Sequence, residues 1–416
     1  MQKVNLTDIA TLMRYLKRTV AREVRLIRND ANACRFISLR QAGTCRGKVL
    51  LSYILDPFIR EDGQSISNAH TNYWESFQIA QTFLDYGFMV DVIDWRNTIT
   101  IPSQRDYDVF IDNRFNMERL SPLLAEDCLR IMHIDNANIV FLRAAEAQRL
   151  LALQQRRGII LDPRMAQPIN HAIEYAHCAV CLGNSFTMST FEYANKPMYR
   201  VPISTPTVYS WQQDKNFDAC RRHFLWFGSR SFVHKGLDLV LEAFSEMADY
   251  HLTVVGPVER EPDFHHAYQK ELYHTPNIHT IGWLDVDSPQ FREITESCIG
   301  VVFASAGEGG AGSVISAMHA GLIPIVSYES SVDVEDFGFL LQESSVAEIQ
   351  VAVRRLSELP AKELEARSRR TWEFARAHHT RETFAAAYRA TVQKMLGSAS
   401  VGTLTPLLEA NSTVSL

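Results

Sequence analysis

The sequence predicts an α/β protein with two domains, each built on a doubly wound parallel sheet. Buried apolar strands alternate with helices from Lys48 to Leu182, and the same alternation begins again at Phe224. Such βαβ alternation is typical of parallel sheets with helices on both faces. The chain has 416 residues, which exceeds one ordinary hydrophobic core. The stretch Pro202–Ala219 is rich in Pro, Thr, Ser and Gln, and we interpret it as the linker between the two series.

Each series is assigned from apolar runs bounded by turn residues. In the first series, the expected strands are 49–55, 88–94, 108–112, 129–134 and 176–182, with helices at 71–86 and 144–156. In the second, the expected strands are 224–228, 251–255, 278–281, 299–304 and 322–327, with a helix at 237–247. Ligands of such sheets bind at the carboxyl ends of the strands, so we expect a cleft where the two sets of strand ends face each other.

The chain is therefore divided into five segments. They are a helical prefix (1–45), a first Rossmann-like domain (46–205), a second Rossmann-like domain (206–380), a terminal helix packing back on the first domain (381–396) and a disordered tail (397–416). Apolar residues of the prefix recur at helical spacing among arginines and lysines. Such a helix can lie on an anionic membrane through residues 1–30, or pack on the protein's own surface. The absence of Trp and Phe from its apolar face favours packing.

Composition narrows the function classes. The net charge of −6 gives no reason to expect nucleic acid as a partner. No apolar run is long enough to span a bilayer, and charged residues interrupt the N-terminal segment where a signal peptide would be apolar. Seven cysteines, an odd number, indicate reduced thiols and a cytoplasmic protein, with contact at the inner face of a membrane as the alternative location. Cys178 and Cys181 form a CxxC within an apolar run, which favours core packing over zinc.

A glycine-rich loop is the most informative local feature. Glycines at 307, 309, 310 and 312 lie between the strand 299–304 and a short helix that begins at Ser313. Glycines allow the backbone to approach a phosphate, and the free N–H groups of a helix N-terminus point at it. Glu308 lies inside the loop, where a carboxylate suits a hydroxylated ring better than a phosphate. The loop therefore predicts a nucleotide-sugar site.

Several motifs of the second half agree in order and spacing with one known family. They are FGSRSFVHKGLDLVLEAF, LTVVGP, IGWLD and SAGEGGAGSVISAMHAGLIPIVS, between Phe224 and about Leu341. This half resembles the retaining GT-B glycosyltransferases of family 4, also called glycosyl transferases group 1, whereas the first half resembles them only in layout. The resemblance implies a GT-B fold, in which two Rossmann-like domains face each other across a cleft.

The resemblance also implies roles for individual residues. An Arg and a Lys five residues apart hold the donor's diphosphate, and the matching positions are Arg230 and Lys235. Of the family's two glutamates, Glu308 matches the one that contacts the donor sugar. The second, which binds the ribose hydroxyls, is replaced by Ser316. The loop and helix start contribute the remaining donor contacts, Gly309, Gly310, Gly312 and Ser313.

Two histidines of the first half are candidate catalytic residues. His70 precedes a helix after a long loop, and His133 ends a strand, and both places suit the cleft or a structural role equally. Asp285 and Asp287 form a DxD, but the run Asp287-Ser288-Pro289 is typical of a helix cap. We therefore expect no metal and no cofactor, because two cations and a helix N-terminus can stabilise a leaving diphosphate.

The motifs thus favour a metal-independent hexosyltransferase whose first domain lies on the acceptor side and whose second domain binds the nucleotide sugar. The retaining outcome is implied by the resemblance alone. The enzyme's donor is a nucleoside diphosphate sugar, and its acceptor is a glycan, a lipid or a small molecule. Two alternatives stay open. One is a nucleotide-sugar epimerase of the same architecture. The other is a degenerate sugar-nucleotide or glycan-binding protein, suggested by Ser316 because serine cannot accept two hydroxyls as a carboxylate does.

Overall fold

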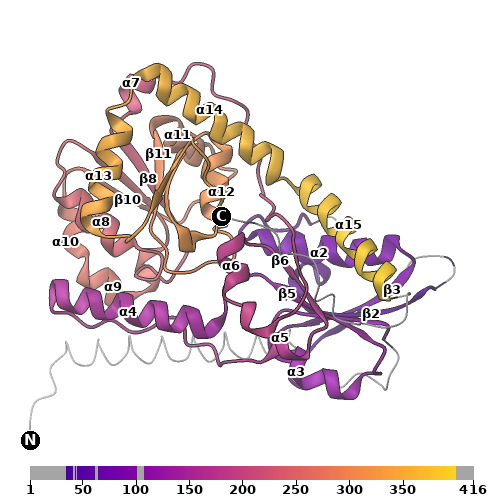
Figure 1. Cartoon of the computed structure of the whole chain (residues 1–416). Coiled ribbons are helices and arrows are strands. Elements are labelled where there is room, and N and C mark those ends of the chain that lie inside the picture. Colours follow the sequence, from indigo (N-terminus) through magenta and orange to yellow (C-terminus); the bar gives the residue numbers. More distant parts are fainter. Residues whose placement is uncertain (1–33, 41–42, 44, 61–63, 101–106, 400–416) are drawn as a thin grey trace, which may run out of the picture.

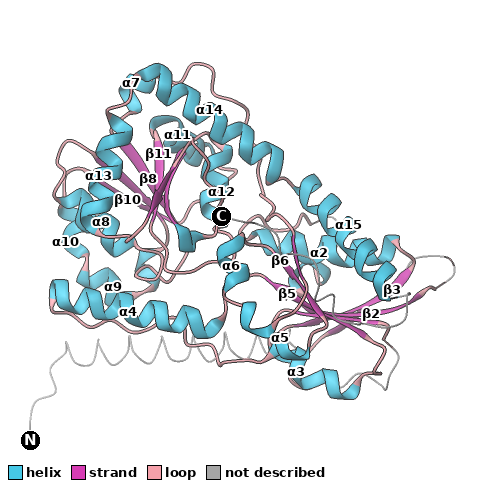
Figure 2. Cartoon of the chain, in the orientation of Figure 1, coloured by secondary structure: helices cyan, strands magenta, loops and turns pink. Residues whose placement is uncertain are grey.

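The chain folds into two α/β domains joined by a short connection and by two long helices (Figure 1). The computed structural model describes residues 34–40, 43, 45–60, 64–100 and 107–399. In each domain, helices cover both faces of a mainly parallel sheet (Figure 2). The predicted fold class, two Rossmann-like domains, is confirmed.

The first sheet has seven strands in the order β1-β3-β2-β4-β5-β6-β7. They are β1 Phe36–Leu39, β2 Gly47–Tyr53, β3 Phe88–Asp94, β4 Val109–Asp112, β5 Leu129–Ile134, β6 Cys178–Cys181 and β7 Met198–Arg200. All neighbours pair in parallel except β1, which runs antiparallel to β3. The chain builds to one side of β2 and then to the other, so the switch point lies between β2 and β4.

The second sheet has six strands in the order β10-β9-β8-β11-β12-β13, all parallel. They are β8 His223–Phe227, β9 His251–Val255, β10 Ile278–Gly282, β11 Gly300–Phe303, β12 Ile323–Ser327 and β13 Phe339–Leu341. Its switch point lies between β8 and β11. These strands are apolar on both faces because helices cover both sides.

The helices fall into two groups. Those of the first domain are α2 Thr71–Asp85, α3 Phe115–Leu120, α4 Ile139–Arg157, α5 Ala172–Tyr175 and α6 Ser185–Ser189, with 3₁₀ turns Asp56–Phe58, Ser121–Leu123 and Glu192–Ala194. Those of the second are α7 Phe217–Cys220, α8 Leu237–Ser245, α9 Pro262–Ala267, α10 Gln269–His274, α11 Pro289–Ser297, α12 Gly312–His319, α13 Val346–Ser357 and α14 Ala361–His378, with 3₁₀ turns Val258–Arg260 and Tyr328–Ser330.

The last helix, α15 (Arg381–Ala399), continues from α14 and lies on the first domain beside α2 (Figure 1). Its side chains Phe384, Tyr388, Val392 and Met395 are buried in the same core as β2 and β3. The C-terminal segment therefore holds the two domains together from the side of α2.

Helix α4 joins the domains on the other side, because it belongs to the first sheet but packs under the second domain (Figure 1). Leu153 is buried in the core of the second domain. Arg156 forms ion pairs with the fully buried Asp238 at 2.7 Å and with Glu242 at 2.9 Å. Arg149 donates a hydrogen bond to the carbonyl oxygen of Ala304 at 2.9 Å. These contacts fix the end of β11 relative to the first domain.

Two expectations require correction. The segment 1–45 is not helical throughout, because Phe36–Leu39 forms β1 at the edge of the first sheet. Four alternating residues carry too weak a pattern for assignment from sequence. The helix expected at 144–156 begins earlier, at Ile139, because the side chain of Asn138 caps it by accepting from the Val140 N–H at 2.9 Å. The predicted prefix helix lies outside the described residues, as do residues 400–416 of the predicted tail (397–416), whereas residues 397–399 of that tail belong to α15.

Within the described residues, none of the helices combines the length and apolar character needed to cross a membrane.

Candidate active site

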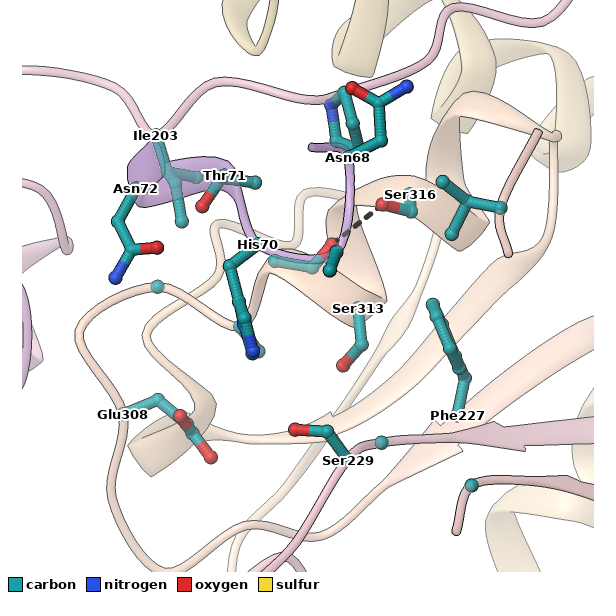
Figure 3. A pocket seen from close by; sticks show the side chains of 18 of the residues that line it. Asn68, His70, Thr71, Asn72, Ile203, Phe227, Ser229, Glu308, Ser313 and Ser316 are labelled. Carbon is teal, nitrogen blue, oxygen red and sulfur yellow. Dashed lines mark hydrogen bonds between the residues drawn. The ribbon is translucent and has the colours of Figure 1, made fainter. Parts of the chain in front are cut away.

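A cavity lies between the two domains, at the switch points of both sheets (Figure 3). The first domain contributes Tyr53 at the end of β2, the start of α2 and Asp135 after β5. The second contributes the loop after β8, the glycine loop after β11 and the start of α12. Among the predicted residues, the structure brings together His70, Lys235, Glu308, Gly310, Gly312, Ser313 and Ser316 in its lining.

The glycine loop owes its shape to two different properties of glycine. Gly310 has a φ of +100°, which side chains of L-residues rarely adopt. Gly309 lies against the backbone of the first domain, where an added Cβ would overlap the Asp135 carbonyl and lie 2.5 Å from Asn136 Cα. The loop therefore brings the second domain into direct contact with the end of β5, and Gly309 is buried there rather than in the cavity lining.

We expect Gly309→Ala to destabilise the protein by about 1–3 kcal/mol, because its Cβ would overlap backbone atoms that cannot rotate away. Thermal unfolding measures the effect. Gly312→Ala is the matched control, since its Cβ would have Thr71 Cγ2 as nearest neighbour at 3.5 Å and lies in a helix. Equal melting temperatures for both variants would contradict this close approach of the two domains.

The two charged residues Lys235 and Glu308 form an ion pair on the second-domain wall of the cavity. Lys235 Nζ lies 2.5 Å from Glu308 Oε1, and both side chains are largely buried. Ser305 Oγ donates to the same carboxylate oxygen at 3.0 Å. Gly236 follows Lys235 with a φ of +71°, and an added Cβ would lie 2.8 Å from the Ala304 carbonyl carbon. The loop after β8 is thereby pressed against the end of β11, which brings Lys235 to Glu308.

Arg230 lies in the same loop as Lys235, but its side chain is exposed and does not line the cavity. Its charge is nonetheless close enough to act on His70. The pKa of His70 is lowered, first by loss of hydration and then by the charges of Arg230 and Lys235. His70 therefore tends to be neutral at physiological pH and able to accept a hydrogen bond. In Figure 3, His70 and Glu308 lie on facing walls of the cavity.

His133 lies outside the cavity lining, in contrast to His70. It is fully buried in the first domain, with its ring centroid 4.8 Å from that of Tyr53 and 6.3 Å from that of Tyr388. Burial lowers the pKa of His133 to about 4. A neutral ring behind Tyr53 can support that residue but does not reach a ligand, so we do not carry the catalytic prediction for His133 into the proposed site.

Ser316 lines the cavity from α12 (Figure 3). Its hydroxyl donates to the carbonyl oxygen of Gly312 at 2.9 Å, one helical turn earlier. The lone pairs of the hydroxyl remain for a ligand, but they cannot replace the two oxygens of a carboxylate. Ser313 lies at the start of the same helix, where its backbone N–H is among the first four without a helical partner.

The lining residues of the first domain that were not predicted include Tyr53, Asn72, Glu75 and Asp135. Tyr53 donates to Asp135 Oδ2 at 3.2 Å, and Asn113 donates to the same oxygen at 3.3 Å. Tyr53 and Asp135 both end or follow parallel strands, so strand-end position was the available signal. Asn72 and Glu75 lie on α2, where an acidic residue ordinarily indicates an exposed face.

The DxD aspartates have structural partners. Ser288 is the N-cap of α11 and accepts from the Phe291 N–H at 3.2 Å, with Pro289 at the first helical position, so the capping interpretation is confirmed. Asp287 accepts hydrogen bonds from Asn68 of the first domain and Thr207 of the linker. The described part of the chain contains no group of three or more His, Cys, Asp or Glu side chains arranged to hold a metal ion.

Comparison with known proteins agrees with this geometry. Residues 221–358 match the sequence profile of the family Glycosyl transferases group 1. No curated protein sequence matches the chain. Among solved structures, sucrose-phosphate synthase from Thermosynechococcus elongatus is similar with a TM-score of 0.60 at 13% identity, over 85% of this chain and 100% of that one. Anabaena HepE in complex with UDP-glucose is similar with a TM-score of 0.54 at 12% identity, over 84% of this chain and 99% of that one. The chain therefore has the GT-B fold, and its second domain carries the region that the Glycosyl transferases group 1 profile describes.

Proposed function

We propose that this protein is a retaining glycosyltransferase of family 4 type, which transfers a hexose from a nucleoside diphosphate sugar to an acceptor hydroxyl without a metal. The observation that supports it most is the cavity between the two switch points. There Lys235, Glu308 and the N-terminus of α12 line one wall. Two of the similar solved structures are described as complexes of Anabaena HepE with UDP-glucose and with UDP and glucose.

The second domain offers a place for each part of the donor. Phe227 and Trp283 line the cavity beside the ends of β8 and β10, and apolar rings suit a nucleobase. Lys235 and the first N–H groups of α12 suit the diphosphate, because both present positive charge to the cavity. Arg230 is exposed in the same loop and can turn toward a phosphate with little cost in burial.

Glu308 lies on the same wall as Lys235 and faces His70, so we assign the sugar ring to the space between Glu308 and His70 (Figure 3). In the reaction, the acceptor oxygen forms a bond to the anomeric carbon while the bond to the diphosphate breaks. The nucleoside diphosphate leaves with the electron pair, and the acceptor proton passes to a departing phosphate oxygen. Lys235 stabilises the charge that grows on the leaving group, and Glu308 stabilises the positive charge of the sugar ring.

The alternatives predict different chemistry for the same site. A degenerate binding protein, suggested by Ser316, binds the nucleotide sugar but does not release nucleoside diphosphate. An epimerase changes the sugar. Purified protein incubated with UDP-glucose distinguishes them, because slow hydrolysis with release of UDP and free glucose is expected only of the transferase.

Removing either cation of the loop after β8 is expected to weaken nucleoside diphosphate binding. The loss of one charged hydrogen-bonding partner costs roughly 1.5–3 kcal/mol, which corresponds to about tenfold to hundredfold in affinity. Calorimetry with UDP on wild type, Arg230→Ala and Lys235→Ala measures this. Lys235→Ala should have the larger effect, because Lys235 lines the cavity whereas Arg230 is exposed outside the lining.

Arg222→Ala is the matched control, because Arg222 is exposed at the opposite end of β8 and lies outside the cavity lining. It should bind UDP as tightly as wild type. If Arg230→Ala and Lys235→Ala also bind UDP with wild-type affinity, this loop does not hold the donor's phosphates.

A further inference from the structure

The first-domain wall of the cavity presents hydrogen-bond acceptors that the fold leaves unused. Asn72 and Glu75 are three residues apart on α2, so they lie on one face of that helix, and both line the cavity. Among the residues that the structure describes, Asn72 Oδ1 and Glu75 Oε2 are both buried and have no hydrogen-bond partner. Buried polar atoms are rarely left this way, because they lose their hydration without compensation. Figure 3 shows Asn72 beside His70 on this wall.

Glu75 is held so that its free oxygen cannot turn elsewhere. The side chain is fully buried, and its Oε1 accepts from both the backbone N–H and the hydroxyl of Ser204, each at 2.8 Å. Ser204 belongs to the connection between the domains. With Oε1 occupied, Oε2 is the oxygen left for a ligand.

The surroundings of this wall favour a ligand that donates hydrogen bonds over an anion. Asp135 also lines this part of the cavity and receives hydrogen bonds from Tyr53 and Asn113. Of the nearby arginines, Arg114 lies 3.6 Å from Asp135, and Arg381 donates from Nη2 to Asn68 at 3.0 Å while its buried Nε has no partner within the part of the chain that the structure describes. Among the described residues, Lys235 is the one Lys or Arg in the cavity lining, and it belongs to the opposite wall.

We propose that Asn72 and Glu75 form the acceptor subsite and bind hydroxyl groups of a neutral, polyhydroxylated acceptor, such as an unphosphorylated sugar. This inference rests on the proposed function, because it assigns the opposite wall to the donor. With Glu75 ionised, hydroxyls on a sugar ring donate to Asn72 Oδ1 and Glu75 Oε2, and an acceptor phosphate at this position is repelled by Asp135 and Glu75.

The proposal is tested on the full chain by saturation-transfer NMR with UDP present at saturation, at about pH 8, because burial raises the pKa of Glu75 to about 7 and this hydrogen-bond acceptor must be ionised. The probes are D-glucose and D-glucose 6-phosphate, which differ only in the phosphate. Wild type should bind D-glucose, and D-glucose 6-phosphate should bind more weakly. Glu75→Gln keeps the acceptor for Ser204 but turns the free oxygen into an NH₂ donor, so its affinity for D-glucose should fall about tenfold. The affinity of Asn72→Ala for D-glucose should also fall.

Glu126→Gln is the matched control, because Glu126 is exposed and lies outside the cavity lining. UDP affinity of each variant serves as its folding control. The inference is overturned if the phosphorylated sugar binds more tightly, if D-glucose does not bind the UDP complex, or if Glu75→Gln binds it as wild type does. It is also overturned if Glu75→Gln weakens UDP-glucose relative to UDP, because Glu75 would then contact the donor sugar. Failure of wild type to bind UDP overturns the proposed function as well.

Discussion

Glu308→Gln should lower the rate of nucleoside diphosphate release from UDP-glucose by about a hundredfold, with donor affinity equal to or tighter than that of wild type. The side chain keeps its shape and an oxygen for Ser305, whose hydroxyl donates to Glu308 Oε1 at 3.0 Å. The negative charge is lost, and with it the stabilisation of a positively charged sugar ring. Lys235, which lies 2.5 Å from the carboxylate, loses the negative charge of its partner and is held less tightly, so it can turn to the phosphates. Turnover is therefore expected to fall while donor affinity stays the same or rises.

Single-turnover release of UDP gives the rate, and calorimetry with UDP-glucose in the absence of acceptor gives the donor affinity. Glu343→Gln is the matched control, because Glu343 is an exposed residue of the same domain outside the cavity lining. If Glu308→Gln turns over as wild type does, the glycine loop is not the reaction centre. If rate and affinity fall together, Glu308 holds the donor but does not act on the reacting bond.

The fold was predictable because it depends on local patterns. The strands β3 and β9 have the expected bounds, and Gly228 and Gly282 mark where β8 and β10 end. What the sequence could not show is how the domains meet. Helix α4 joins them through ion pairs between residues about eighty positions apart, such as Arg156 with Asp238. Charged residues on a helix ordinarily indicate an exposed face, so this contact has no local signal.

The second-domain half of the site was predictable for a different reason. Glycine is needed where the backbone has a positive φ or packs too closely for a Cβ, as at Gly236 and Gly310. The glycines of the sequence therefore indicate directly where such turns lie. In the first-domain half, the role of a residue depends on whether its side chain is buried or lines the cavity. The residue type alone does not reveal this. Glu75 resembles any helical glutamate, and His133 resembles any strand-end histidine. The structure places Glu75 in the cavity lining and His133 behind Tyr53.

Burial of Glu75 should make the stability of the protein depend on pH in a way that Glu75→Gln removes. Burial raises the pKa of this carboxyl from its ordinary value to about 7, opposed by the hydrogen bonds from Ser204 and increased by the charge of Asp135. A raised carboxyl pKa means that the folded state binds the proton more tightly than the unfolded state between the two pKa values. The free energy of unfolding of wild type therefore falls as pH rises through this window.

When the pH is raised from about 5.5 to about 8, the free energy of unfolding of Glu75→Gln should rise by about 2 kcal/mol relative to that of wild type. Urea unfolding at both pH values measures it. Asp112 and Asp238, whose pKa values burial raises to about 6, titrate in wild type and variant alike and cancel in the difference. A difference that does not change with pH would show that Glu75 ionises in the cavity as it does in water. The hydrogen bonds of Ser204 alone would then account for its place in the fold, and the free oxygen would be a solvated one.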